Sequence, residues 1–401
     1  MEYNRKFLIL IEWPQLFEEL RVTTENFSRR QFTKLSGMAL LGSTVNLPFT
    51  LRAARELTLF VGTYTSGRSE GIYVYRMDQS TGALTQASFI KSDNPSFVTL
   101  DPSKRFLFAV NETANGAVSA FRIDPVSHEL TALNKQSSEG ADPCHLMVDS
   151  HRRCVLVANY TGGNVAVLPI QRDGSLGAAS DVEQHEGSGP RAQQQSAHAH
   201  CIKLDRANRY AYAADLGTDK VMIYRFNRAA TKLDAAPQPF AALHSGAGPR
   251  HLTLHPNGRF LYVINELDSS ITTFRSDPVR GTLTAFESVS TLPREFTGTS
   301  YCADIHVSRS GRFLYGSNRG HNSIVVFAID RRTGRLSLVE HVSTQGKWPR
   351  NFTIEPSGRF LLVANQHTDN VVSYHIDSQT GRLMPTGHVT EIPVPVCLQF
   401  F

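Results

Sequence analysis

Hydrophobic and polar positions repeat along this chain with a long period. An Arg followed six residues later by Asn or Asp, with an apolar or aromatic run between them, occurs six times at intervals of 47 to 56 residues. The pairs are Arg105/Asn111, Arg153/Asn159, Arg209/Asp215, Arg259/Asn265, Arg312/Asn318 and Arg359/Asn365. Self-similarity at this period is typical of propellers and solenoids, in which each repeat buries its apolar face against its neighbours.

The pattern inside each repeat predicts several short strands. The Arg opens a strand such as 260–264 and the Asn closes it; an alternating segment such as 271–274 follows, and then a polar turn that leads to a Leu. This turn and its Leu occur seven times, at Leu84, Leu130, Leu176, Leu233, Leu283, Leu336 and Leu383. Short alternating runs separated by Gly, Asn and Asp turns indicate β-strands, so the repeats are predicted to be all-β.

The number of repeats predicts a closed ring. A four-stranded propeller blade takes roughly 40 to 50 residues, so residues 55–401 accommodate seven blades. The first unit starts at 57–64 without a preceding inner strand, whereas the chain ends on 394–401, which has the pattern of an inner strand. We therefore expect an all-β, seven-bladed β-propeller that is closed by the C-terminal strand pairing into the first blade, which leaves no long open edge.

The residues before the propeller resemble an export signal. Residues 28–34, SRRQFTK, are similar to the twin-arginine motif, and the mildly apolar stretch 35–51 follows them. Such signals are read by a receptor and are set aside in fold reasoning. We expect a leader over 1–54 that is recognised by the twin-arginine export machinery, and a propeller domain over 55–401 in the periplasm. A basic amphipathic N-terminus and a cytoplasmic location are the alternatives.

Composition narrows the classes of partner. Hydrophobic residues make up 41% of the chain and charged residues 19%, which suits a globular domain with a substantial core. The net charge of +5 is spread without a basic block, which argues against nucleic-acid binding. No run approaches the 18 or so apolar residues of a membrane span. The five cysteines lack C-x-x-C spacing, so we expect no metal site. We also expect no other cofactor and a monomeric protein.

Candidate chemistry lies at positions that differ between otherwise similar repeats, since the recurrent Arg and Asn are best explained as structural. One variable set directly follows the recurrent Asn or its equivalent: Tyr64, Glu112, Tyr160, Leu216, Glu266, Arg319 and Gln366. A second set lies at the entrance to the inner strands: His145, His198, His200, Arg250, His251, Asp304, His306, Arg350 and Asn351. Because strand direction alternates, both sets are expected at one mouth of the channel, where Arg, His and Glu suit an anionic substrate and proton transfer.

Three segments resemble a known family. They are GPRHLTLHPNGRFLYVINELDSSI from Gly248, ADIHVSRSGRFLYGSNRGHNSI from Ala303 and WPRNFTIEPSGRFLLVANQ from Trp348. All three are similar to bacterial 6-phosphogluconolactonases of the seven-bladed propeller type, and the resemblance covers about residues 57–401. Fungal carboxy-muconate cyclases share this superfamily. The resemblance implies a catalytic His, two Arg and a Glu at the channel mouth, which fall on His198, Arg250, Glu266 and Arg319.

The resemblance and the residue types together predict a metal-independent lactonase. Glu266 or His198 would deprotonate water, and Arg250 with Arg319 would stabilise the oxyanion. The remaining candidates would contact a small, anionic lactone: His200, His251, Asp304, His306, Arg350 and Asn351. Export would favour an unphosphorylated or extracytoplasmic lactone. The alternatives are a cycloisomerase acting on a muconate-type lactone and a non-catalytic exported binding module, because the fold alone does not determine the function.

Overall fold

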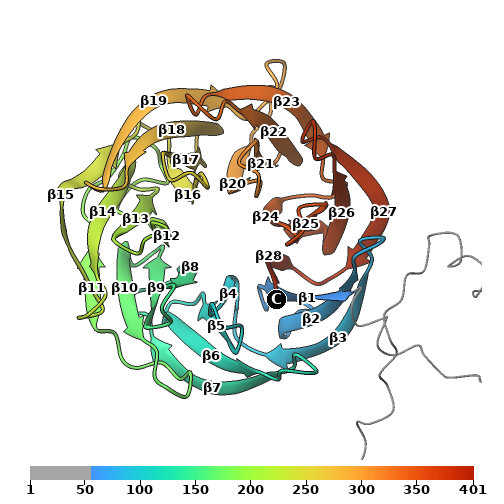
Figure 1. Ribbon diagram of the computed structural model, residues 1–401, viewed down its shortest axis with the longest axis horizontal. Helices are drawn as coiled ribbons and strands as arrows, with labels where there is room; N and C mark the ends of the chain where they lie inside the picture. The colour runs from blue at the N-terminus through green and yellow to red at the C-terminus, as the bar shows by residue number, and fades with distance from the viewer. Residues whose placement is uncertain (1–55) are drawn as a thin grey trace, which may run out of the picture. The chain divides into compact units, whose positions relative to one another are not determined.

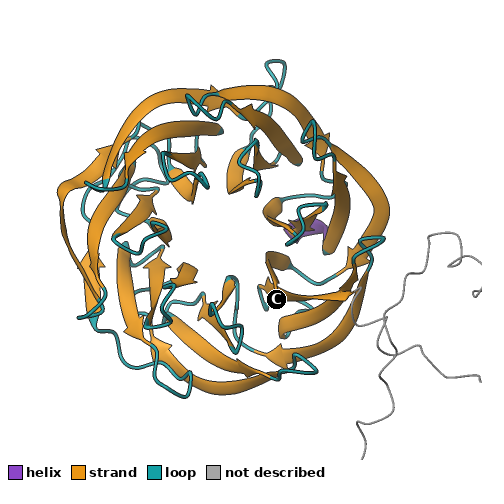
Figure 2. Cartoon of the chain, in the orientation of Figure 1, coloured by secondary structure: helices purple, strands orange, loops and turns teal. Residues whose placement is uncertain are grey.

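The computed structural model describes residues 56–401, and the expected leader over 1–54 lies outside the described residues. In this range 28 β-strands form seven antiparallel sheets of four strands each (Figure 1). The helical part of the same range is one 3₁₀ turn, η1 (Gln366–Thr368), as Figure 2 shows. None of the described helical segments has the length and hydropathy needed to cross a membrane.

We number the sheets as blades 1 to 7 in chain order. Blade 1 contains β28 (Pro395–Phe400), β1 (Glu56–Thr63), β2 (Gly71–Asp78) and β3 (Leu84–Lys91). Blade 2 contains β4 (Val98–Leu100), β5 (Phe106–Asn111), β6 (Ala117–Ile123) and β7 (Leu130–Ser137). Blade 3 contains β8 (Pro143–Val148), β9 (Cys154–Asn159), β10 (Asn164–Pro169) and β11 (Asp181–Gln184). Blade 4 contains β12 (Ala199–Leu204), β13 (Tyr210–Asp215), β14 (Lys220–Asn227) and β15 (Lys232–Ala242).

The remaining blades follow the same order. Blade 5 contains β16 (Pro249–Leu254), β17 (Phe260–Asn265), β18 (Ser270–Asp277) and β19 (Thr282–Ser290). Blade 6 contains β20 (Tyr301–Val307), β21 (Phe313–Arg319), β22 (Ser323–Ile329) and β23 (Leu336–Ser343). Blade 7 contains β24 (Pro349–Ile354), β25 (Phe360–Asn365), β26 (Asn370–Ile376) and β27 (Leu383–Glu391). In Figure 1 the first strand of each sheet lines the centre of the ring and the last forms its rim.

The ring closes through the C-terminal strand, as the patterns at the two ends of the repeat region predicted. β28 pairs antiparallel with β1, with Leu398 opposite Val61 and Phe400 opposite Leu59. This pairing confirms a seven-bladed propeller whose first blade is completed by the C-terminal strand. Blade 1 therefore joins both ends of the described chain and has no open inner edge.

The core of the propeller is divided among the contacts between blades. Seven hydrophobic clusters lie in the described residues, and each is shared by two neighbouring blades. One of them joins Leu59 of blade 1 to Phe360 of blade 7, and both side chains are almost fully buried. Burial on both faces of each sheet explains the nearly continuous apolar runs that follow the recurrent Arg.

In blade 6 the recurrent Arg and Asn connect neighbouring blades. The two Nη atoms of Arg312 donate to the backbone oxygens of Ser378 and Gln379, 3.3 and 2.9 Å away, in the outer turn of the next blade. The Asn318 Nδ2 atom donates to the oxygen of Thr291, 3.0 Å away, in the segment that leads in from the preceding blade. These contacts give the recurrent pair a structural role in the scaffold.

Candidate active site

The inner strands carry an irregularity at the same place in six blades. The pairing of the first strand with the second shifts register next to Pro143/His145, Ala199/Cys201, Pro249/His251, Cys302/Ile305, Pro349/Asn351 and Gly62/Thr63. A β-bulge leaves one residue unpaired and re-aims its side chain. Arg250 and Arg350 occupy the unpaired positions of β16 and β24, where a regular strand would alternate faces.

Glu266, Arg250 and Arg319 meet at the channel mouth. The Glu266 Oε2 atom lies 2.9 Å from Arg250 Nε and 2.7 Å from Arg319 Nη2. Each arginine also donates to the backbone of blade 6, Arg250 to Ala303 O at 2.7 Å and Arg319 to Cys302 O at 2.8 Å. The Glu266 side chain remains 18% exposed, whereas that of Arg250 is 2% exposed. Two buried guanidinium groups are thus fixed below a carboxylate that solvent reaches.

The charges of this cluster are coupled. Burial by itself would raise the pKa of Glu266, but the guanidinium groups of Arg319, Arg250 and Arg350 outweigh it and lower this pKa. Burial and the nearby Arg319 lower the pKa of Arg250 to about 10. Glu266 is therefore ionised and Arg250 is cationic at neutral pH; because arginine is not deprotonated in proteins, two guanidinium groups face one carboxylate here.

His198 approaches the same cluster from blade 4. Its ring stacks on Tyr160 with 4.5 Å between ring centroids, and its Nδ1 atom lies 2.9 Å from the Tyr160 carbonyl oxygen. Because a carbonyl oxygen only accepts hydrogen bonds, Nδ1 carries the hydrogen and neutral His198 keeps a lone pair on Nε2. Burial and the Glu266 carboxylate raise the pKa of Tyr160 to about 12, so this ring is near the charged cluster and stays protonated.

A second charged cluster lies on the blades 7, 1 and 2. Arg350 Nη2 donates to the Tyr64 hydroxyl at 2.7 Å, and that hydroxyl donates to Glu112 Oε1 at 2.8 Å. Ser96 donates to the other carboxylate oxygen of Glu112. The sequence placed Tyr64 and Glu112 at variable positions without assigning them a role, and it missed Ser96. The signal for Ser96 was its place at the entrance to an inner strand, where other blades carry Arg250 or Arg350.

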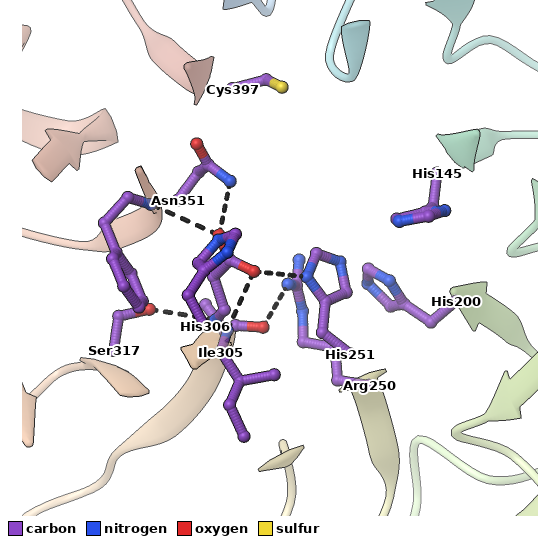
Figure 3. Close-up of polar contacts among 12 residues, drawn as sticks. His145, His200, Arg250, His251, Ile305, His306, Ser317, Asn351 and Cys397 are labelled. Atoms are coloured by element: carbon purple, nitrogen blue, oxygen red, sulfur yellow. Dashed lines mark hydrogen bonds and ion pairs between the residues drawn. The ribbon is translucent and has the colours of Figure 1, made fainter. Parts of the chain in front are cut away.

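A layer deeper, the Asp304 carboxylate joins three blades through His251, His306 and Asn351, whose side chains Figure 3 labels. Its carboxylate accepts from His251 Nδ1 at 2.8 Å, from His306 Nε2 at 2.9 Å and from Asn351 Nδ2 at 2.6 Å. Burial would raise the pKa of Asp304, but the charge of His306 and the hydrogen bonds hold it well below its usual range. Burial and Arg250 lower the pKa of His251 to about 4, so its ring is neutral.

His200 and His145 also lie in this buried layer. His200 Nδ1 is 3.5 Å from Cys144 Sγ, and the rings of His145 and His200 both pack edge-on against His251 at 5.4 Å between centroids. Burial holds the pKa of each of these two histidines well below its usual range. A cavity of about 10 Å³, room for roughly one water molecule, is lined by Arg250 and Arg350 together with His251 and Asn351 of this layer.

The predicted site residues therefore fall into two groups. In the first group, Arg250 and Arg319 contact Glu266, His198 contacts Tyr160, and Arg350 contacts Tyr64. The second group forms the buried layer around His251 and contains His200, His251, Asp304, His306 and Asn351.

Comparison with known proteins identifies the family to which this chain is similar. The family model of the seven-bladed β-propeller lactonases matches residues 58–400. A 6-phosphogluconolactonase of Bacillus subtilis (strain 168) is 38% identical over 343 residues, which cover 85% of this chain and 97% of that protein. A 6-phosphogluconolactonase of Formosa agariphila is 34% identical over 308 residues, which cover 74% of this chain and 86% of that protein.

Solved structures agree with the sequence relatives. The periplasmic gluconolactonase of Pseudomonas aeruginosa superposes with a TM-score of 0.83 and 36% identity, covering 86% of this chain and 99% of that one. Similarity of this extent in both sequence and structure shows that the chain belongs to the lactonase family of seven-bladed β-propellers.

Proposed function

We infer that this protein hydrolyses the ester bond of a sugar lactone. Membership of the lactonase family, the names of its relatives and the cluster of Arg250, Arg319 and Glu266 support this function. The observation that carries it is the pair of buried guanidinium groups fixed by one carboxylate, because such groups stabilise negative charge without reorganising during the reaction.

The reaction creates an oxyanion when water adds to the lactone carbonyl carbon. Arg250 and Arg319 are the donors for this oxygen, and each is already held by a backbone carbonyl of blade 6. A well-placed donor of this kind typically contributes roughly 3 to 4 kcal/mol to transition-state stabilisation. Glu266 keeps the two guanidinium groups together, and its lowered pKa makes it a weak base for taking a proton from water.

His198 is the better proton acceptor of the two candidates. The lone pair on Nε2 takes a proton from the attacking water while Nδ1 stays bonded to Tyr160. When the tetrahedral intermediate collapses, the bond between the carbonyl carbon and the ring oxygen breaks, and His198 returns the proton to that oxygen. The products are an aldonic acid and an unchanged enzyme, so the step needs no other reactant.

A kinetic comparison of two arginines tests this function. Arg319→Ala is expected to lower kcat/KM for an aldono-1,5-lactone by about 100-fold to 1,000-fold, since one oxyanion donor is lost. The matched control is Arg335→Ala, which removes an exposed arginine of the same blade that pairs with Glu287. Wild-type turnover by a folded Arg319→Ala protein would contradict the proposed site.

We also propose that the protein is exported. The twin-arginine-like residues 28–34 support this location, and one relative of known structure is named a periplasmic gluconolactonase. Cell fractionation of the full chain is expected to recover activity in the periplasm, and the double change Arg29→Lys with Arg30→Lys is expected to retain it in the cytoplasm. The same distribution of wild type and double variant between periplasm and cytoplasm would contradict the proposal.

A further inference from the structure

The cluster formed by Arg350, Tyr64, Glu112 and Ser96, which we name the Glu112 cluster, has no part in the oxyanion site. It lies on the blades 7, 1 and 2, whereas Arg250, Glu266 and Arg319 belong to blades 5 and 6. Both clusters border one cavity, since Glu112, Arg250 and Arg350 all line it. A substrate that reaches Arg250 therefore comes next to the Glu112 cluster.

The charged side chains at the mouth carry one more positive than negative formal charge. Three guanidinium groups, Arg250, Arg319 and Arg350, face two carboxylates, Glu266 and Glu112. The net charge of +1 balances the single negative charge that develops on the carbonyl oxygen of an uncharged lactone. A phosphate ester would add about −1.5 to −2 more at neutral pH.

Three buried histidines beneath the mouth do not supply further cations. His145, His200 and His251 are neutral, because burial lowers the pKa of each of them. In the layer below, the Asp304 carboxylate and the Lys203 ammonium carry opposite charges, and both act on the same histidines. Charges on exposed residues contribute less, because solvent and salt screen them.

The Arg350 guanidinium group already has hydrogen-bond and charge partners within the protein. Its Nη2 atom donates to Tyr64 and lies 3.9 Å from Glu112 Oε1. Burial would lower the pKa of Arg350, but Tyr64, Glu112 and Glu266 raise it, so the guanidinium keeps its charge and its partners. The sequence assigned Arg350 to the binding of an anionic group, yet the anion beside it belongs to the protein.

The Glu112 carboxylate still has unused acceptor capacity. A carboxylate accepts about four hydrogen bonds, and Glu112 accepts from Tyr64 and Ser96. Its side chain is 15% exposed at the mouth. The remaining lone pairs suit the hydroxyl groups of a sugar, which donate hydrogen bonds, and they repel a phosphate or a second carboxylate.

Building on the proposed function, we propose that the Glu112 cluster is the specificity-determining subsite for the hydroxyl groups of an uncharged sugar lactone. Glu112 accepts hydrogen bonds from the substrate, and Tyr64 and Arg350 hold its carboxylate in place. The subsite selects against lactones that carry a phosphate or a free carboxylate.

The test compares three lactones with the purified full chain: an uncharged aldono-1,5-lactone, the same lactone with a 6-phosphate, and a muconolactone-type carboxylate. The wild type is expected to prefer the uncharged lactone at least tenfold in kcat/KM. Glu112→Gln keeps the shape and, through its amide oxygen, the hydrogen bond from Tyr64, but it removes the charge and its amide nitrogen donates to Ser96 instead of accepting. This change is expected to reduce that preference at least tenfold, through a higher KM for the uncharged lactone and a lower KM for the phosphorylated one.

Two further variants keep the proposal open to refutation if Glu112→Gln folds poorly. Tyr64→Phe removes the hydroxyl between Arg350 and Glu112 and is expected to raise KM for the uncharged lactone while kcat stays within about twofold. The matched control Glu340→Gln changes a carboxylate that pairs with Arg382 away from the inner strands and is expected to leave the preference unchanged.

The outcomes separate the two proposals. A wild-type preference for the phosphorylated lactone, or a folded Glu112→Gln protein with an unchanged preference, would overturn the role of the Glu112 cluster while lactone hydrolysis stands. Failure of the wild type to hydrolyse any of the three lactones would remove the basis of both proposals.

Discussion

At the channel mouth, the role of each titratable side chain follows from which of its atoms already form hydrogen bonds or ion pairs within the protein. Glu266 is bound by two guanidinium groups, whereas His198 is bound only through Nδ1 and leaves Nε2 for a proton. The sequence could not choose between these two bases, because both residue types perform general base catalysis. The choice needed the contact with Tyr160 and the lowered pKa of Glu266, which depend on residues from three other blades.

Removing the proton acceptor is expected to affect catalysis more than binding. His198→Gln should lower kcat for an uncharged aldonolactone by about 100-fold or more, because general base catalysis contributes about a 10² to 10⁴ factor. KM is expected to change little, since His198 holds no substrate group in this account. Steady-state kinetics over a range of pH checks the prediction. A large rise in KM at constant kcat would instead make His198 a binding residue.

The buried histidines predict how stability depends on pH. The pKa of His251 is lowered from 6.5 to about 4, so the unfolded chain takes up its proton before the folded chain does. Stability from this group is complete above about pH 6.5 and is lost as the pH falls toward 4, with a slope of at most about 1.4 kcal/mol per pH unit. His251→Gln should flatten the slope of the unfolding free energy in urea titrations between these pH values.

A matched histidine on the surface controls for this effect. His151 is exposed on the turn between β8 and β9, so His151→Gln makes the same substitution away from the buried layer and serves as the reference variant in the same titrations. Equal slopes for wild type and His251→Gln would contradict the assignment of His251 as a neutral buried group.

At the scale of elements, the strands could be predicted from the sequence more completely than the site. The repeated Arg, Asn and turn Leu indicated the seven units and their order, because each recurs with the same local chemistry. The bulges of the inner strands could not be predicted, since one unpaired residue leaves no periodic signal in so short a strand. Arg250 and Arg350 occupy these unpaired positions, so their contacts with Glu266 and Tyr64 emerged only in the structure.

The loop before β16 supplies an element-scale prediction. Gly248 has φ +66°, and a Cβ atom there would lie 2.4 Å from Leu267 Cγ. Its carbonyl also accepts from the Glu266 N–H at 2.7 Å. Gly248→Ala is therefore expected to cost about 1 to 3 kcal/mol of stability and to lower activity, because the positions of Arg250 and Glu266 shift.

Another glycine separates backbone strain from displacement of the site. Gly258 has φ +70°, but a Cβ atom there would meet no other atom within 4 Å. Gly258→Ala should cost roughly 1 kcal/mol from backbone strain alone and should keep wild-type activity. Melting curves and lactone hydrolysis of the two variants check both parts. Full activity of Gly248→Ala would show that this loop does not position the catalytic groups.

For the molecule as a whole, the ring depends on its last strand. Leu398 of β28 is 5% exposed and packs between blades 1 and 7, opposite Val61 of β1. Leu398→Ala is expected to lower the free energy of unfolding by about 2 to 5 kcal/mol, because it leaves a cavity where the two ends of the chain meet.

An outer-strand leucine provides the control for ring closure. Leu338 in β23 is 57% exposed, so Leu338→Ala should change stability by no more than about 0.5 kcal/mol. Denaturant unfolding of both variants measures the difference. Equal stabilities would mean that the pairing of β28 with β1 contributes little to the fold.

The account as a whole rests on side chains from the channel mouth acting as one catalytic unit, and a double-mutant cycle in kcat/KM measures this directly. Arg250→Ala and Glu266→Gln are each expected to lower kcat/KM for an uncharged aldonolactone by about 100-fold or more. Because they disable the same unit, the double variant should be at most about tenfold worse than the worse single variant. Losses that multiply in the double variant, or single variants with wild-type rates, would contradict the account.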